Sequence, residues 1–137
     1  MSQTQSSSEV PTLFRVIVEV GNLDEAATFY QRLFNTPGQR HPGARHYFQC
    51  GSVVVAVIDP TRGGLPPNPG PKSLYFAARD IDAVHQRAAE LNALAPYSVH
   101  GEPAADLLNR PWGERSFYVV DPWGNDLCFV EEGTLYT

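Results

Sequence analysis

The alternation of apolar and polar positions predicts a first strand over residues 13–20, bounded by Pro11 and Gly21. Successive side chains of a strand point to opposite faces. One face carries the apolar set Phe14, Val16, Val18 and Val20, and the other carries Arg15, Ile17 and Glu19. We expect the first face to pack on a helix, and the second, with its two charges, to face water or a cavity.

A helix is predicted next, over residues 23–34, because apolar residues recur there at spacings of three and four. Asn22 or Asp24 is the expected N-cap, and Pro37-Gly38 ends the element. We interpret Phe29, Tyr30 and Phe34 as core residues. A short edge strand within residues 38–43 and strands over 45–50 and 52–59 complete this half.

The second half repeats this order. A strand over residues 73–78 leads into a helix over 80–92, followed by a strand at 96–100, a loop at 102–111 and a closing hairpin around the D-P-W-G-N turn at 121–125. Residues 18–26 align with residues 77–84 if Gly21 is skipped. Residues 60–71 between the halves hold five prolines, so we expect no regular element there, but a linker that can lie over a site.

Composition narrows the class of protein. The chain has 137 residues, 42% of them apolar and 18% charged, and a formal charge of -5, which suits one compact globular unit. No basic run favours nucleic acid, and no apolar stretch approaches the ~20 residues that span a bilayer. Residues 1–10 are interpreted as a disordered tail without signal-peptide character, which predicts a cytoplasmic protein. Cys50 and Cys128 are expected to be reduced, buried thiols.

The R-P-W-G-E-R segment at 110–115, the D-P-x-G-N turn and the internal repeat resemble the glyoxalase/bleomycin-resistance/extradiol-dioxygenase group, the vicinal oxygen chelate superfamily. The resemblance covers residues 12–132. It implies an α+β fold of two βαβββ modules, at residues 11–59 and 72–132, forming a curled open mixed sheet with helices outside and a concave site within. Members commonly form dimers with sites at or near the interface.

The resemblance also implies four positions that hold a divalent metal in metal-dependent members. In this chain they fall on Arg15, Leu74, Cys128 and either Val55 or Val57. Arginine does not lose its proton in proteins, and leucine and valine have no lone pair to give, so we predict no metal and no other cofactor. His85 is interpreted as a surface residue. A non-standard site made from His46 and His100 with Glu19 or Asp126 stays open as an alternative.

What is left of the implied site is a mostly apolar cavity, as small-molecule pockets tend to be. We predict that its ligand contacts are Arg15, Ile17, Glu19, Val57, Leu74, Phe76, Trp112 and Cys128, with Val55 and Val130 also in its wall. Arg15 either anchors an acidic group of the ligand or forms a salt bridge with Glu19. Trp112 either stacks on a flat ligand or packs on a neighbouring module. Tyr75 is expected in the core, and Trp123 at the surface or an interface.

These patterns favour a metal-independent protein that binds a small organic molecule, as bleomycin-resistance-like proteins do. The alternatives are a lyase, isomerase or dioxygenase with a divalent metal on unusual ligands, and a metal-free enzyme that moves protons with Arg15, Glu19 or His46. We expect a homodimer, a small-molecule partner, and neither nucleic acid nor membrane as a partner.

Overall fold

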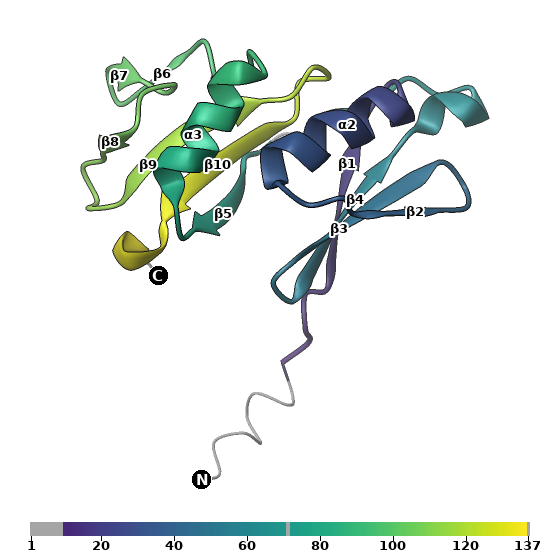
Figure 1. Cartoon of the computed structure of the whole chain (residues 1–137), viewed down its shortest axis with the longest axis horizontal. Coiled ribbons are helices and arrows are strands. Elements are labelled where there is room, and N and C mark those ends of the chain that lie inside the picture. Colours follow the sequence, from purple (N-terminus) through teal and green to yellow (C-terminus); the bar gives the residue numbers. More distant parts are fainter. Residues whose placement is uncertain (1–9, 71, 137) are drawn as a thin grey trace, which may run out of the picture.

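The computed structural model describes residues 10–70 and 72–136, and two similar modules make up the molecule (Figure 1). The first module consists of β1 (Arg15–Glu19), α2 (Leu23–Phe34), β2 (Gln39–His41), β3 (Arg45–Cys50) and β4 (Val53–Ile58). The second consists of β5 (Leu74–Ala78), α3 (Ile81–Glu90), β6 (Ser98–Val99), β7 (Glu102–Pro103), β8 (Leu108–Asn109), β9 (Arg115–Val120) and β10 (Asp126–Glu131). A short 3-10 helix, η2 (Glu132–Thr134), follows β10.

Each module contains one four-stranded mixed sheet. The strand orders are β1-β4-β3-β2 and β5-β10-β9-β8, with β1 parallel to β4, β5 parallel to β10, and the other neighbours antiparallel. This confirms the α+β class with two modules and sheets that do not close. Within the described residues the two sheets share no ladder, so β1 and β5 are both edge strands.

The apolar stripe of each helix packs on its own sheet. Asn22 Oδ1 accepts a hydrogen bond from the Glu25 amide, and Asp80 Oδ1 accepts one from the Ala83 amide, so each helix has a side-chain N-cap. Leu23 and Ile81, the first residues of α2 and α3, are both buried. The caps therefore fix where each helix begins, and the buried apolar residues of each helix define the face that packs on its sheet.

Both helices belong to one hydrophobic core shared by the two modules. Its largest fully buried side chains include Tyr30 and Phe48 of the first module and Phe117 and Leu127 of the second. Complete burial of a side chain of this kind contributes about 1.5–3 kcal/mol. The open face of the second sheet carries a smaller separate cluster, made of Ala95, Ala104, Tyr118, Cys128 and Val130. The segment before β9 therefore covers part of that face.

The D-P-W-G-N turn between β9 and β10 joins the modules. Tyr30 Oη of α2 donates to Asp121 Oδ2 at 2.6 Å, and Asn125 Nδ2 donates to the Glu19 carbonyl oxygen at 2.8 Å. The indole of Trp123 lies against Gly21, where an added Cβ would sit 2.8 Å from Nε1. We call this group of contacts the clasp.

The structure differs from the prediction in two segments, and a third predicted segment lies mostly outside the described residues. The prediction that no regular element forms in residues 60–71 is wrong, because Asp59 caps a 3-10 helix, η1 (Pro60–Gly63). The strand expected at 96–100 is reduced to the two residues of β6. Most of the expected disordered tail, residues 1–9, lies outside the described residues. In the described part of the chain, neither helix has the length and apolar character needed to cross a bilayer.

Candidate functional site

The open face of the first sheet is the one that α2 leaves uncovered. Val18 and Val20 are buried on the α2 side and Ile17 is 57% exposed on the open side, as predicted for β1. Phe14, expected on the buried face, instead precedes β1 and is exposed. Strand pairing arranges this face in three rows across β1, β4 and β3. The rows are Arg15–Val54–Gln49, Ile17–Ala56–Tyr47 and Glu19–Ile58–Arg45. The open face thus has an apolar centre with charged side chains around it.

Three basic side chains surround Tyr47 on this face. The Arg15 guanidinium carbon lies 5.5 Å from the ring centroid, Arg45 Nη1 donates to Tyr47 Oη at 2.8 Å, and the His41 ring centroid is 4.5 Å from that of Tyr47. Neither arginine forms an ion pair with a carboxylate of the described residues. Glu19 instead accepts a hydrogen bond from the Asn68 amide at 2.9 Å, so the alternative Arg15–Glu19 salt bridge is not formed.

The open face of the second sheet carries hydroxyl and thiol groups. Cys128 and Tyr118 are buried there, and Tyr75 Oη lies 3.2 Å from Tyr118 Oη. Burial raises the pKa of the Cys128 thiol to about 12, and burial together with the Tyr75 hydroxyl raises the pKa of Tyr118. The Cys128 thiol and the Tyr118 hydroxyl therefore keep their protons at neutral pH. The protonated, fully buried Cys128 thiol is a poor nucleophile.

The R-P-W-G-E-R segment, residues 110–115, lies beside this second open face and is held there by hydrogen bonds. We call residues 110–115 the clamp. The fully buried Arg110 side chain donates through Nη2 to the carbonyl oxygens of Asp106 at 2.8 Å and Ser116 at 3.0 Å. Glu114 accepts from Trp112 Nε1 and from the Tyr136 amide, both at 2.7 Å. A pocket of about 350 Å³ results, with Tyr75, Ala77, Glu114, Val130 and Tyr136 in its wall. We did not predict Arg110 or Glu114 as site residues, although the motif itself was the available signal.

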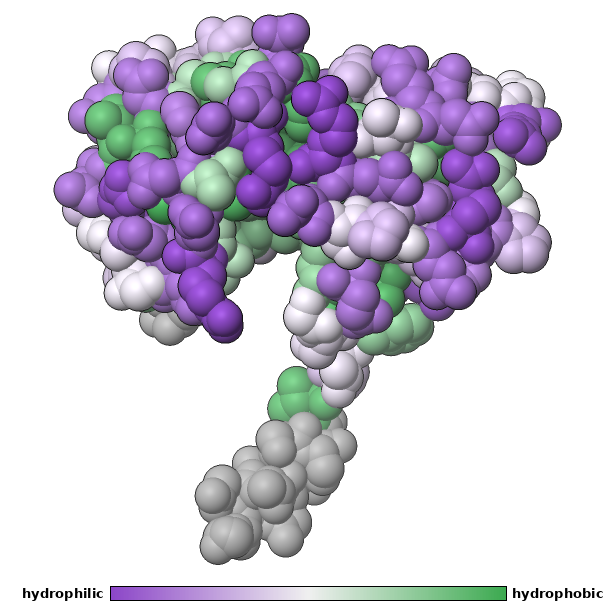
Figure 2. Space-filling model, viewed as in Figure 1, coloured by the Kyte–Doolittle hydropathy of each residue, from purple (hydrophilic) through white to green (hydrophobic). Residues whose placement is uncertain are grey.

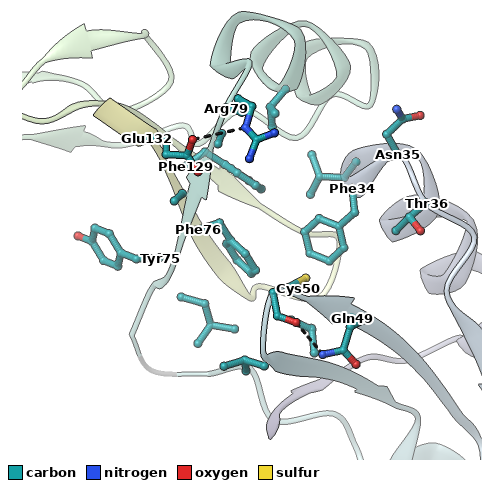
Figure 3. Close-up of a pocket in the computed structure, with 18 of the residues that line it drawn as sticks. Phe34, Asn35, Thr36, Gln49, Cys50, Tyr75, Phe76, Arg79, Phe129 and Glu132 are labelled. Carbon is teal, nitrogen blue, oxygen red and sulfur yellow. Dashed lines mark hydrogen bonds and ion pairs between the residues drawn. The ribbon is translucent and has the colours of Figure 1, made fainter. Parts of the chain in front are cut away.

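A larger cleft lies between the two modules, on the helix-bearing side of β1 and β5. Its volume is about 1000 Å³, and Figure 2 shows the molecule hollowed between its two halves. Phe34 of α2 meets Phe76 of β5 at 5.3 Å between ring centroids, and Phe76 stacks on Phe129 at 5.2 Å. In Figure 3 these rings point into the cleft, whereas Tyr75 points away from it. Arg79 and Glu132 form an ion pair at the rim, at 3.5 Å.

A single chain does not bring the predicted ligand contacts together. Arg15, Ile17 and Glu19 lie on one open face and Cys128 on the other, with Trp112 in the clamp beside the second. Leu74 and Phe76, with Val55, line the cleft between the modules, and Val57 is fully buried under α2. The expectation of one shared cavity is wrong for the single chain, while the ligand contacts themselves stay predictions.

The error arises from the alignment of the two halves. When the N-caps Asn22 and Asp80 are matched and Gly21 is not skipped, Ile17 corresponds to Tyr75, and these two side chains are 57% and 58% exposed. Tyr75 therefore faces outward with Cys128, and its expected place in the core is wrong. By the same matching, Arg15 corresponds to Ser73, not to Leu74.

The residues at the implied metal positions do not fit a divalent metal. Glu19 pairs with Ile58 and Ala77 with Val130, so the counterpart of Cys128 in the first module is Ala56. The four positions then hold Arg15, Ala56, Ser73 and Cys128, of which only a hydroxyl and a protonated thiol could bind a metal. No group of three or more His, Cys, Asp or Glu side chains gathers for a metal anywhere in the described residues.

The two histidines of the alternative metal site are engaged elsewhere. His46 is buried on the α2 side of the first sheet, where Nδ1 accepts from Arg40 Nε at 3.2 Å and Nε2 bonds to the Pro37 carbonyl oxygen at 2.9 Å. The His100 ring packs against Trp112 in the second module. The structure does not bring them together with Glu19 or Asp126.

Comparison with known proteins identifies the family. The model of the Glyoxalase/Bleomycin resistance protein/Dioxygenase superfamily matches residues 12–129. Similar solved structures include a glyoxalase/bleomycin resistance protein from Albidiferax ferrireducens T118, with 21% identity, 87% of this chain and 97% of that chain covered, and a TM-score of 0.70. A lactoylglutathione lyase from Agrobacterium tumefaciens shows 21% identity, 90% and 95% coverage and a TM-score of 0.61. The oxidase ChaP-H2 shows 20% identity, 89% and 94% coverage and a TM-score of 0.68.

A search of curated proteins finds no match. At identities near 20% the solved structures establish the fold alone. The family model spans most of the chain. The chain belongs to the glyoxalase/bleomycin resistance protein/dioxygenase superfamily.

Proposed function

We propose that the protein binds a small organic molecule, without a metal, on a concave and mostly apolar surface that includes the open face of the first sheet. The observation that carries this proposal is the apolar centre formed by the exposed Ile17 and the half-buried Tyr47, flanked by Arg15 and Arg45, which have no carboxylate partner among the described residues. Pockets for small molecules combine such an apolar floor with a few polar groups that fix orientation. The lack of a fitting metal donor set supports binding over metal-dependent catalysis.

We also propose a homodimer that completes this surface. The edge strand β1 and the residues before it expose Leu13 at 66%, Phe14 at 59% and Ile17 at 57%, and the edge strand β5 exposes Tyr75 at 58%. Exposed apolar edges invite pairing with another chain. If β5 of a second copy lies beside β1, the open face of the first sheet meets the open face of the other copy's second sheet. Arg15, Ile17 and Glu19 then share a cavity with Cys128 and Trp112 of the second copy.

The same pairing covers the cleft between the modules. Leu13, Val16, Leu74 and Phe76 line that cleft next to the two edges, so a second copy buries them together with the edge strands. In a two-fold symmetric dimer, β1 of each chain pairs with β5 of the other, so both strands of both chains gain a partner. The cleft is therefore assigned to the dimer contact and the open faces to the ligand.

We further propose that the protein works in the cytoplasm and does not bind nucleic acid. Both cysteines of the chain are free thiols in the structure, and such thiols suit a reducing compartment. A formal charge of -5 disfavours contact with phosphate backbones.

Metal content separates the proposed function from its main alternative. The protein, purified without chelator, is offered Mn, Fe, Ni, Zn and Mg in turn, and bound metal and melting temperature are measured. We expect no stoichiometric metal and no rise in melting temperature. One tightly bound ion per chain with a higher melting temperature would overturn the proposal and make a metal-dependent lyase, isomerase or dioxygenase the leading function.

Ligand binding is then tested directly. A library of small organic molecules is screened by thermal shift, and each hit is measured again with Arg15→Ala and with Arg32→Ala as the matched control. Arg32 is an exposed arginine of α2, the helix that covers the opposite face of this sheet. We expect Arg15→Ala alone to weaken the hits. A library without hits, or hits that ignore Arg15→Ala, would count against this site.

A further inference from the structure

We propose that the molecule bound on the open face of the first sheet is a planar organic anion, whose acidic group is held by Arg15 and Arg45 and whose ring lies over Ile17 and Tyr47. This inference rests on the proposed function, because it names the ligand class of the same surface. A carboxylate or a sulfonate on an aromatic ring has the required chemistry.

The positive charge on this face is local, and among the described residues neither Arg15 nor Arg45 forms an ion pair, although Glu19 lies on the same face. Arg15, Arg45 and His41 all contact the one ring of Tyr47, at the distances given above. Other arginines of the chain differ, since Arg40 pairs with Asp24 at 2.9 Å and Arg115 pairs with Asp82 and Glu131 at 3.3 Å. Two neighbouring guanidinium groups without a carboxylate repel each other, and a bound anion relieves that repulsion.

The side chains are also oriented for this task. Arg45 is fixed through one nitrogen, because its Nη1 donates to Tyr47 Oη at 2.8 Å. The Arg15 guanidinium lies against the rings of Phe14 and Tyr47, at 4.9 and 5.5 Å from their centroids. The N–H donors of a guanidinium group match the two oxygens of a carboxylate, and contact with an aromatic ring does not use them as conventional hydrogen bonds would.

The two carboxylates that the opposing face of a second copy would bring, Asp126 and Glu114, already have hydrogen-bond partners within their own chain. Both oxygens of Asp126 accept from the Tyr97 hydroxyl, at 2.7 and 2.6 Å. The two oxygens of Glu114 accept from Trp112 Nε1 and the Tyr136 amide. The net charge of -5 lowers the encounter rate with anions, but contact affinity depends on the groups within a few ångströms.

Two fluorescent probes that differ mainly in one acidic group test this inference. 8-Anilinonaphthalene-1-sulfonate carries a sulfonate, whereas N-phenyl-1-naphthylamine has the same ring system without it. Both are titrated against the full chain and against Arg15→Gln, Arg45→Gln and the control Arg32→Gln. We expect the wild type to prefer the sulfonate. Each of the first two variants should bind the sulfonate about tenfold more weakly, as for a lost charge-assisted hydrogen bond, and the neutral probe unchanged.

The other outcomes separate this inference from the proposed function. Equal affinity of the wild type for both probes, or sulfonate binding that Arg15→Gln leaves unchanged, would overturn the anion assignment while small-molecule binding still stands. If neither probe binds, the anion assignment fails, and the library screen alone decides whether small-molecule binding stands. Sedimentation of each variant provides the last control. If Arg15→Gln lowers sulfonate binding only because the dimer dissociates, Arg15 is an interface residue and the anion assignment is overturned.

Discussion

Asp121 accepts four hydrogen bonds, from the Tyr30 hydroxyl, the Trp123 and Asn125 amides, and the Asn125 side chain. We expect Tyr30→Phe to lower the free energy of unfolding by about 1.5–3 kcal/mol, because it removes a buried hydrogen bond to a charged group. Tyr97→Phe is the matched control, since that hydroxyl also bonds to a carboxylate but its residue is 37% exposed. Urea unfolding measures both. An equal decrease in the free energy of unfolding of the two variants would show that burial does not strengthen the Tyr30–Asp121 hydrogen bond.

The two thiols make stability depend on alkaline pH. Burial raises the pKa of Cys50 from 9.0 to about 11 and that of Cys128 from 9.0 to about 12. The unfolded chain therefore loses these protons at lower pH than the folded chain does. The contribution to stability is fully present below about pH 9 and is lost as the pH rises through about 11 and 12.

We predict that the urea midpoint falls above pH 9 and that Cys128→Ala makes this fall shallower. Iodoacetamide should modify folded Cys128 far more slowly than the unfolded chain at pH 8, because the thiolate is the reacting form. Rapid alkylation of the folded protein would contradict a protonated, buried thiol. Unfolding curves between pH 7 and 11 supply the measurement.

The connection between β1 and α2 packs directly on the turn between β9 and β10. An alanine Cβ at Gly21 would lie 2.8 Å from Trp123 Nε1, so one of the two must move. We predict that Gly21→Ala destabilises the protein by about 1–3 kcal/mol, in the range of overpacking. Trp123→Leu should destabilise less in the Gly21→Ala background than alone, which a double-mutant cycle from urea unfolding detects. Strict additivity would mean that the two residues do not contact.

The sequence predicts the elements of this fold better than it predicts their faces. The charges of Arg15 and Glu19 identify the open side of β1, and the cap residues identify where both helices start. Every residue of β5 is apolar, so alternation does not reveal which side faces the core. In the structure Phe76 packs against the core and Tyr75 faces outward, which agrees with matching the Asp80 cap to the Asn22 cap.

The candidate site was only partly predictable for a related reason. Arg15 was found because a charged residue within an apolar strand stands out in the sequence. Arg110 and Glu114 were missed because much of what they bind is backbone, at Asp106, Ser116 and Tyr136. Backbone partners leave no pattern in the sequence. The gathering of Arg15, Tyr47 and Arg45 across three strands depends likewise on strand pairing, which sequence alone does not give.

The edge strands β1 and β5 border the cleft between the modules, and the oligomeric state of the whole molecule tests the proposed dimer. We expect Leu13→Glu to shift the protein from dimer to monomer in sedimentation velocity, because a charge at the edge of the cleft would be buried without a partner. Leu65→Glu is the control, since Leu65 has nearly the same exposure, 65% against 66%, but does not line the cleft. A wild-type monomer, or dissociation of both variants, would refute the proposed arrangement.

The clasp has a consequence for how the protein emerges from the ribosome. Tyr30 and Asp121 are separated by 91 residues, so at about 5–20 residues per second the first module waits roughly 5–20 s for its partner. During that interval the side chains of Phe34 and Val16, which line the cleft between the modules, have no second module beside them. Chaperone capture, or pairing between nascent chains on one messenger, would shield them. The yield of native protein should therefore depend on translation speed between β4 and β10, a property that no measurement on the finished fold reveals.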